Sequence, residues 1–334
     1  MRRPSRRSSA ILAILASGLA AGALIASHRS VANERRHSAH TLTLRVGKPT
    51  GRTIPAGFLG LSFEYPAVEP YTGTNPNAVN PVLLQLIRNL SPGQAPSLRI
   101  GGDSTDWTWW PVPGVAKPLG IKWTLTPTWV HVIGALAHDL GARLILGINL
   151  ELDSARDASA EARALVGGIG RSSIVGLEPG NEPELYGSFS FYVLPGGKAV
   201  TGRPSGYDFS DYLRDFSKIS RSLPRVPLVG PATGAKRWIP QLRRFLAAQP
   251  RVRVATLHKY PLQTCFIAPA LPQYPTIAHL LAPLASKGLA GSIAPFVVVA
   301  HERHIPLRID EMNSDSCGVA PGISNGFVSA LWAL

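Results

Sequence analysis

Short apolar runs recur along this chain, separated by stretches that are long enough to hold a helix. The runs lie at residues 58–63, 97–100, 143–149, 173–177, 227–230, 252–257 and 307–309, and each predicts a strand. Helix-like segments, such as residues 127–140, 207–223 and 238–248, lie between them. Strands that alternate with helices favour a parallel sheet, and about seven such units at this length favour a TIM-type (β/α)8 barrel. The sequence therefore predicts an α/β protein of that class.

The predicted barrel stops one unit short. Residues 296–300 include three valines and resemble a strand, but they lie too close to the run at 307–309 for a crossover, so they are predicted to be the middle of a helix. After residue 309 there is room only for a loop and an apolar helix at residues 323–334. An open barrel would expose strand edges and apolar surface, so we interpret the chain as a fragment, truncated before the eighth βα unit.

The first 32 residues have the order of a secretory signal peptide. Residues 1–9 are rich in arginine, residues 10–26 are uncharged and apolar, and Ser30, Val31 and Ala32 offer small side chains to a signal peptidase. An uncleaved membrane anchor is the alternative. The rest of the chain is expected to be secreted or extracytoplasmic: a linker and N-terminal strand at residues 33–46, with the strand at 41–46, and the barrel domain at residues 47–334.

Charge and motifs exclude several function classes. The formal charge is +14, but residues 1–40 alone hold seven arginines and one acid, and no block of Lys or Arg follows, so nucleic-acid binding is not favoured. No glycine-rich phosphate loop and no CxxC or HExxH spacing is present in the sequence, so neither an organic cofactor nor a metal is expected. The two cysteines, Cys265 and Cys317, are interpreted as one disulfide of an exported protein, with buried thiols as the alternative.

Two glutamates occupy the strand ends where a (β/α) barrel carries its function. Glu182 lies in the string GLEPGNEP at residues 176–183, after the fourth run, and Glu311 ends the seventh. Strands four and seven face each other across the barrel mouth, so both carboxyl groups can reach one cavity. A pair about 5 to 5.5 Å apart hydrolyses glycosides with retention of configuration, and the amide of Asn181 can bond a sugar 2-hydroxyl. The ordinary role of a single glutamate there is a helix cap or a surface charge.

Three further carboxylates lie near the same strand ends. Glu64 directly follows the first run and is a candidate for substrate binding. Glu178 precedes a Pro-Gly bend, and strand alternation points Asp310 to the opposite face from Glu311. Glu178 and Asp310 are therefore ranked below the two predicted catalytic glutamates.

Four strings together resemble glycoside hydrolase family 79, which contains β-glucuronidases and heparanase-like enzymes and belongs to the clan of retaining (β/α)8 glycosidases. The strings are LRIGGDSTD (98–106), GNEP (180–183), HKY (258–260) and EMNS (311–314), the last with the downstream Gly318. The second string is typical of the whole clan, whereas the first string and the loop after Glu311 carry the narrower assignment. The resemblance runs from about residue 58 to residue 334.

The resemblance implies a role for each matching residue. Glu182 would be the acid/base and Glu311 the nucleophile, while Asp106 and Tyr260 would contact the sugar or the nucleophile. His258, in the same string as Tyr260, joins the substrate-binding set. Capping of a helix by Asp106 and packing of the Tyr260 phenol in the core are the alternatives.

The loop after the seventh strand is implied to bind substrate as well. In the family, the segment that matches Ser316, Cys317 and Gly318 binds the uronate carboxylate through backbone N–H groups, which favour anions without adding a titrating group. Cys265 and Cys317 follow neighbouring strands, and their loops are expected to bring them within bridging range. The family's eighth βα unit and β-sandwich, with a tyrosine that reaches the sugar carboxylate, have no counterpart at the C-terminal end of this sequence.

The expected function is a retaining glycoside hydrolase of the β-glucuronidase type, without metal or cofactor, which cleaves β-linked uronic acid glycosides by double displacement. Its partner would be an oligosaccharide, polysaccharide or other glucuronide, with no nucleic acid and no membrane contact beyond the N-terminal segment. Action on neutral glycosides is one alternative, and a non-catalytic carbohydrate binder or an inactive truncated homologue is another. A separation of the two carboxyl groups well beyond about 10 Å would favour the binder.

Overall fold

The computed structural model describes residues 47–48, 51, 53–90 and 92–334, and Thr53–Leu334 form one compact unit. The predicted signal peptide at residues 1–32 and the predicted strand at residues 41–46 lie outside the described residues. Both stay predictions.

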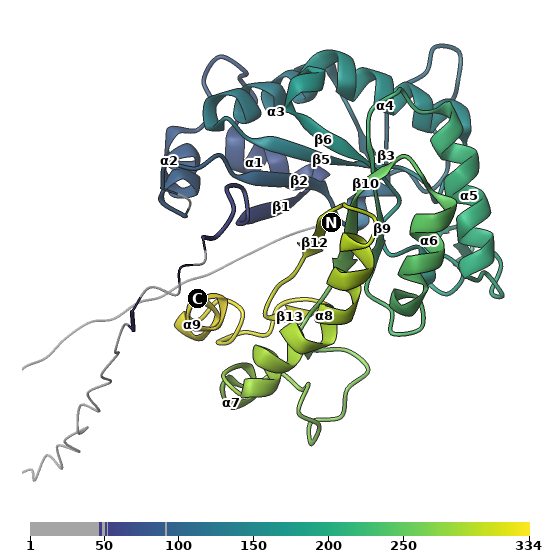
Figure 1. Ribbon diagram of the computed structural model, residues 1–334. Helices are drawn as coiled ribbons and strands as arrows, with labels where there is room; N and C mark the ends of the chain where they lie inside the picture. Colours follow the sequence, from purple (N-terminus) through teal and green to yellow (C-terminus); the bar gives the residue numbers. More distant parts are fainter. Residues whose placement is uncertain (1–46, 49–50, 52, 91) are drawn as a thin grey trace, which may run out of the picture. The chain divides into compact units, whose positions relative to one another are not determined.

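Seven parallel strands form the main sheet, in the order β1-β2-β5-β6-β9-β10-β12 (Figure 1). Their bounds are Gly60–Glu64 (β1), Ser97–Gly101 (β2), Arg143–Ile148 (β5), Ile174–Pro179 (β6), Leu228–Thr233 (β9), Val252–His258 (β10) and Leu307–Glu311 (β12). Each strand coincides with one of the seven apolar runs. The first and last strands, β1 and β12, approach each other, so the sheet is a nearly closed barrel and the predicted fold class is confirmed.

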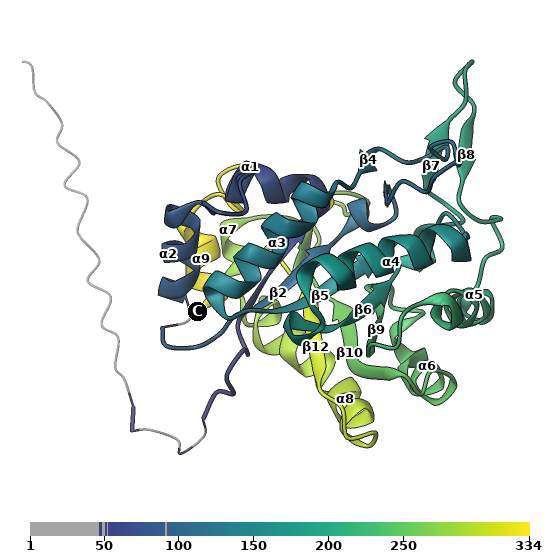
Figure 2. The ribbon, with the colours of Figure 1, turned by 90° about the horizontal axis from the view of Figure 1, so that it is seen from above.

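Helices surround this sheet (Figures 1 and 2). They are Val68–Thr72 (α1), Pro81–Leu90 (α2), Pro127–Leu140 (α3), Ala155–Ile169 (α4), Phe209–Ser222 (α5), Leu242–Ala248 (α6), Ile277–Leu280 (α7), Lys287–His301 (α8) and Phe327–Ala333 (α9). The bounds of α3 match the prediction because both ends are marked in the sequence: the Thr126 side chain accepts the N–H of Trp129, and Gly141 ends the helix at φ 62°.

The core lies between the sheet and the helices. All five residues of β2 are buried, and Leu98 and Ile100 are fully so. A strand buried on both faces normally reads as a continuous apolar run. Arg99 is the exception in β2: it is 3% exposed, and its guanidinium lies inside the barrel among carboxylates.

The segment before β12 is helical, as predicted for residues 296–300. It forms α8, whose Phe296 and Val299 pack against the core while Val298 is exposed. Within the described residues, Pro283–His301 is long and apolar enough to cross a membrane by length and composition alone, with 11% of its window buried. Its place between β10 and β12 makes α8 the outer helix of a βα unit.

The last predicted helix is shorter than expected. It begins at Phe327 and not at residue 323. The chain before it forms turns, in which the N–H of Ser324 bonds to the carbonyl of Ala320 and the N–H of Gly326 to that of Ile323. These tight turns use the backbone groups that a longer helix would need.

Among the described residues the main sheet has seven strands, and the predicted loss of an eighth βα unit stays a prediction. β1 and β12 are its two edges; β1 alternates between exposed and half-buried residues, and β12 is half-buried throughout.

The loops contain three short strand pairs. They are Thr108–Trp109 (β3) with Trp123–Thr124 (β4), Ser190–Val193 (β7) with Ala199–Thr201 (β8), and Leu262–Gln263 (β11) with Asp315–Ser316 (β13). The β7–β8 hairpin projects from the body of the barrel (Figure 2). The β11–β13 pair joins the loops that follow β10 and β12, where two predicted site residues lie.

Candidate active site

Three side chains from three strand ends converge at the mouth of the barrel. Glu182 follows β6, His258 ends β10 and Glu311 ends β12. One carboxylate oxygen of each glutamate and one ring nitrogen of His258 all lie within 4.8 Å of one another. The glutamate side chains are 22% and 21% exposed, whereas that of His258 is fully buried. The structure thus brings the two predicted catalytic carboxyl groups together at a solvent-accessible position.

Glu182 is held by an unusual backbone conformation. Its φ of 43° and ψ of 55° lie in the left-handed region, which costs a residue with a Cβ about 1 kcal/mol or more. Its N–H donates to the carbonyl of Ala232 at 2.9 Å, which ties the loop after β6 to the end of β9. A Cβ at Gly234 would lie 3.0 Å from Oε1 of Glu182, so this glycine leaves room for the carboxylate.

Glu311 accepts hydrogen bonds at both carboxylate oxygens. The Tyr260 hydroxyl donates to Oε1 at 2.6 Å, and Nη1 of Arg99 donates to Oε2 at 2.8 Å. Burial alone would raise the pKa of Glu311, but the charges of His258 and Arg99, together with these hydrogen bonds, lower it to about 2. Glu311 is therefore an ionised carboxylate at any ordinary pH, and the Tyr260 hydroxyl is in direct contact with it.

His258 lies against both glutamates. Its Nδ1 is 3.0 Å from Oε1 of Glu182 and 3.7 Å from Oε2 of Glu311. Burial would lower the pKa of His258, but the charge of Glu311 and the hydrogen bond to Glu182 raise it to about 10. His258 is thus a buried cation at neutral pH. Its contacts are with the two carboxylates, and its predicted role in substrate binding stays a prediction.

Arg99 connects Glu311, at the mouth of the barrel, to two acidic side chains that are buried inside it. Its Nε lies 2.7 Å from Oε2 of Glu178 and 3.2 Å from Oδ2 of Asp310. Glu178 also accepts the Thr256 hydroxyl at 2.8 Å. Burial opposes the charge of Glu178, but Arg99 beside it lowers the pKa of that carboxyl. Glu178 and Asp310 therefore act as positioning residues, because they hold the Arg99 guanidinium that binds Glu311.

The prediction that Asp310 points to the opposite face from Glu311 is wrong. The register between β10 and β12 shifts between Leu257 and His258, and Asp310 is left without a partner in β10. Its carboxylate, 2% exposed, lies inside the barrel beside Arg99 and not on the opposite face. Burial and the charge of Glu178 raise the pKa of Asp310 well above its usual range, so Asp310 holds a proton.

Asp106 is a buried anchor for two loops. Its Oδ1 accepts the N–H groups of Leu150 and Glu151 at 2.9 and 3.0 Å, after β5. Its Oδ2 accepts the N–H of Asn181 at 3.0 Å and the hydroxyl of Tyr186 at 2.7 Å, after β6. The side chain is 3% exposed and both oxygens are occupied. This geometry gives no support to the predicted contact of Asp106 with the sugar; it makes Asp106 a positioning residue for the loop that carries Asn181.

Asn181 has both ends of its amide engaged. Its Oδ1 accepts from Nη2 of Arg99 at 2.8 Å, and its Nδ2 donates to Oδ1 of Asp103 at 3.2 Å. Burial and the charge of Glu64 raise the pKa of Asp103 to about 6. Asn181 is 4% exposed, and its predicted bond to a sugar 2-hydroxyl stays a prediction.

Glu64 organises the loop after β2. Its carboxylate accepts the N–H groups of Asp103 and Ser104 at 3.1 and 2.8 Å, and also the Ser104 hydroxyl. Gly102 makes this approach possible: its φ is +79°, and a Cβ there would lie 2.1 Å from Oε1 of Glu64. The predicted contact of Glu64 with substrate stays a prediction.

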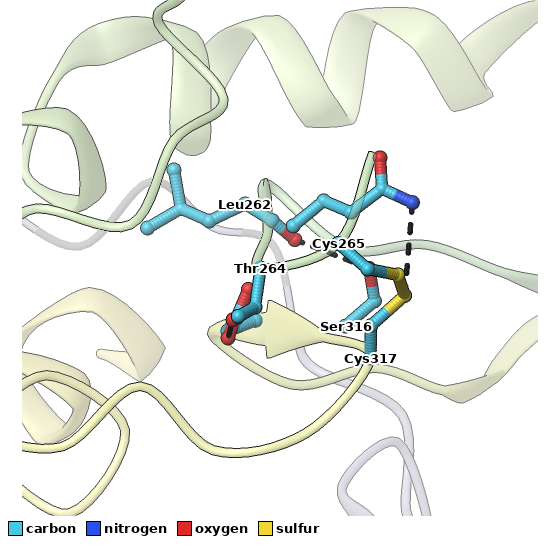
Figure 3. Close-up of a disulfide and its surroundings, with 7 residues drawn as sticks. Leu262, Thr264, Cys265, Ser316 and Cys317 are labelled. Carbon is cyan, nitrogen blue, oxygen red and sulfur yellow. Dashed lines mark hydrogen bonds between the residues drawn. A yellow bond between two sulfur atoms is a disulfide. The ribbon is translucent and has the colours of Figure 1, made fainter. Parts of the chain in front are cut away.

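The loop that contains Cys317 and Gly318 is covalently tied to the loop after β10. Cys265 and Cys317 form a disulfide with Cα atoms 5.8 Å apart, which confirms the predicted pairing (Figure 3). The Gln263 side chain also contacts the Cys317 sulfur at 3.8 Å, and the N–H of Thr264 donates to the carbonyl of Ser316 at 3.1 Å. Cys317 and Gly318 are exposed and have positive φ values of 67° and 127°. Their binding of a sugar carboxylate stays a prediction.

Within the described residues, one group of side chains has the spacing of a metal site, and it is the same trio of Glu182, His258 and Glu311. The raised pKa of His258 keeps a proton on the ring, and a metal needs the neutral imidazole. Both cysteines are used in the disulfide. Without a metal, the protonated imidazole is the partner of the two carboxylates.

Sequence reasoning missed Arg99 as a site residue. It appeared only as part of a family string, although an arginine in the middle of an otherwise apolar strand is itself a signal. Such a cation is buried, so it must meet carboxylates inside the barrel. The position of Asp310 carried no such signal, because a register shift is a property of the paired strands.

No protein-family model matches the chain, and no curated protein matches it. Among solved structures, a 4-O-α-L-rhamnosyl-β-D-glucuronidase from Fusarium oxysporum 12S, in complex with Rha-GlcA, is similar with a TM-score of 0.55 and 23% identity, over 83% of this chain and 59% of that one. A GH51 arabinofuranosidase from Xanthomonas axonopodis pv. citri has a TM-score of 0.47 and 15% identity, over 77% and 56%. A monomeric β-xylosidase from Caulobacter crescentus CB15 has a TM-score of 0.45 and 14% identity, over 82% and 56%.

These neighbours are glycoside hydrolases, and the chain spans between about half and three fifths of the length of each. At 23% identity, the likeness to the rhamnosyl-glucuronidase shows a shared fold. The chain thus has the (β/α) barrel architecture found in that enzyme.

Proposed function

We propose that this chain is a retaining glycoside hydrolase that works by double displacement. One observation carries the proposal: oxygens of Glu182 and Glu311, from opposite sides of the barrel mouth, lie within 4.8 Å of each other. Retaining enzymes hold their carboxyl groups about 5 to 5.5 Å apart, whereas inverting enzymes leave about 6.5 to 9.5 Å for a water molecule. The short separation favours retention, and it also argues against a non-catalytic sugar binder, which has no need of two juxtaposed carboxylates.

The chemistry divides into two steps. In the first, a carboxylate oxygen of Glu311 attacks the anomeric carbon, the bond to the leaving oxygen breaks, and Glu182 gives that oxygen a proton. In the second, Glu182 removes a proton from water, and the water oxygen attacks the anomeric carbon and displaces Glu311. The enzyme returns to its starting protonation state.

The surroundings suit these two roles. Arg99 and Tyr260 keep Glu311 ionised and fix its orientation, as a nucleophile requires. His258 lies 3.0 Å from Oε1 of Glu182, so it fixes the orientation of that carboxyl group beside Glu311. The three partners are themselves at least half-buried, so the geometry is fixed before a substrate arrives.

We further propose that the substrate is a β-linked uronic acid glycoside, such as a glucuronide. The sequence resemblance to family 79 supports this, and the similar solved structure is named as a glucuronidase. The proposed anion contacts are the backbone N–H groups of the loop at Ser316, Cys317 and Gly318. The disulfide in this loop also supports an extracytoplasmic location. Action on a neutral glycoside is the alternative.

The experiment is a hydrolysis assay of the purified chain on an aryl β-D-glucuronide and on the matching aryl β-D-glucoside and β-D-xyloside. We expect release of the aryl group, fastest from the glucuronide. Glu311→Gln should lower kcat by about a thousandfold or more, because it removes the nucleophile. Glu302→Gln, which changes an exposed glutamate on the outside of the barrel, is the matched control and should leave kcat unchanged.

The possible results separate the proposals. Activity that survives Glu311→Gln would remove Glu311 as the nucleophile. Faster hydrolysis of the glucoside or xyloside would overturn the uronide proposal and leave the retaining mechanism in place.

A further inference from the structure

A hollow lined by arginines lies at the opposite end of the barrel from the glutamates. It has a volume of about 470 Å³. Its lining residues lie where α5 ends and where β9 and β10 begin. Its lining includes Arg221, Arg225, Arg251 and Arg253, and it includes no Asp or Glu. A second hollow of about 210 Å³ shares Arg221 and Arg251 with it.

These arginines are not neutralised by the protein. Within the described part of the chain, none of the four forms a salt bridge. Arg251 donates to the carbonyls of Ser220 and Pro224, so it is fixed by the end of α5. The guanidinium groups of Arg221 and Arg225 donate to no group among the described residues, and both side chains are exposed.

The cations that share this hollow repel one another. Arg225 lies close enough to Arg251 that its charge, together with burial, lowers the pKa of Arg251. A guanidinium presents its donors in a planar fork that fits two oxygens of a phosphate or sulfate group. A hollow of about 470 Å³ also has the size of a small-molecule site and exceeds what a single inorganic ion fills.

We propose that this hollow binds a sugar-sized ligand that carries a phosphate or sulfate ester. In this proposal the guanidinium groups of Arg221 and Arg225 donate to the ester oxygens, beside the fixed side chain of Arg251. The sugar ring occupies the remaining space beside Leu223 and Pro227. Because β10 runs from Val252 to His258, this site lies about 20 Å from the glutamates. Its occupation therefore leaves the catalytic mouth free, and the proposal does not depend on the hydrolase function.

The test is isothermal titration of the whole chain with glucose 6-phosphate, glucose 6-sulfate, inorganic phosphate, inorganic sulfate and glucose. We expect one ester-binding site, with the two esters bound more tightly than either inorganic anion and glucose not bound there. The double variant Arg221→Gln/Arg225→Gln should weaken ester binding about tenfold or more, because it removes two charged donors. Both side chains are exposed, so its melting temperature should match that of the unchanged chain.

A matched control removes the same charge elsewhere. Arg88→Gln/Lys198→Gln changes two exposed cations, on α2 and on the β7–β8 turn, and should leave ester binding unchanged. Equal losses in the two double variants would show a diffuse charge effect and overturn the proposal. So would the absence of ester binding, ester binding that Arg221→Gln/Arg225→Gln leaves intact, or esters bound no more tightly than the inorganic anions.

Discussion

Two buried cations, Arg99 and His258, lie among the carboxylates at the carboxyl end of the barrel. Arg99 bonds to Glu178, inside the barrel, and to Glu311, at its mouth. A buried charge that loses its partner is costly, whereas an exposed pair contributes little. The residues that matter for the site are therefore also the residues on which local stability depends.

Arg99→Met should destabilise the fold by about 3–5 kcal/mol, because it leaves the carboxylates of Glu178 and Glu311 without their cation in a buried position. The measurement is the free energy of unfolding from urea titration. Arg243→Gln breaks the exposed pair with Glu302 and should cost less than about 1 kcal/mol. Similar losses in the two variants would contradict the view that Arg99 anchors a buried network.

At the scale of single elements, the loop after β2 depends on one glycine. Gly102 has a φ of +79° and lies directly against the carboxylate of Glu64, which in turn holds the N–H groups of Asp103 and Ser104. A side chain at residue 102 would therefore move both the carboxylate and the loop that contacts Asn181.

Gly102→Ala should lower the free energy of unfolding by about 2 kcal/mol or more, from backbone strain and from the clash with Glu64. Gly93→Ala is the control, since Gly93 also has a positive φ, of +69°, but a Cβ there would meet nothing within 4 Å. Gly93→Ala should show only the strain, about 1 kcal/mol. Equal effects in thermal and urea unfolding would mean that the contact with Glu64 does not matter.

Strands and helices whose signals are local could be predicted from the sequence, whereas features that depend on how two strands pair could not. The strands and α3 were predictable because their signals are local: apolar runs, a Thr126 cap and Gly141 at the helix end. The inward position of Asp310 was not, since it follows from a register shift between two strands that are 49 to 59 residues apart in sequence. The meeting of Glu182 and Glu311 was predictable from the rule that strand ends meet at one edge, whereas the buried role of Asp106 depends on contacts between three loops.

For the whole molecule, the shifted pKa values predict how stability depends on pH. The lowered pKa of Glu311, about 2, adds stability as pH rises toward the unfolded value of 4.5. The raised pKa of His258, about 10, gives stability that is complete below 6.5 and lost as pH rises to 10. Burial raises the pKa of Asp103 to about 6 and of Glu151 to about 8, so their ionisation also removes stability as pH rises.

The free energy of unfolding should therefore be greatest at about pH 4 to 5 and should fall steadily between pH 5 and pH 10. Urea unfolding at fixed ionic strength across this range is the measurement. Glu151→Gln should flatten the fall between pH 5 and pH 8, because it removes one of the groups that must ionise there. A free energy that rises from pH 5 to pH 9 would contradict the buried charges described above.

The central claim is that Glu182 and Glu311 act on one sugar as a retaining pair. The most direct measurement is proton NMR of the sugar that is first released from an aryl β-D-glucuronide, recorded before its anomers interconvert. The short separation of the two carboxylates predicts the β-anomer as the first product. If the α-anomer forms first, Glu311 cannot be the nucleophile of a double displacement, and the account of this site is wrong.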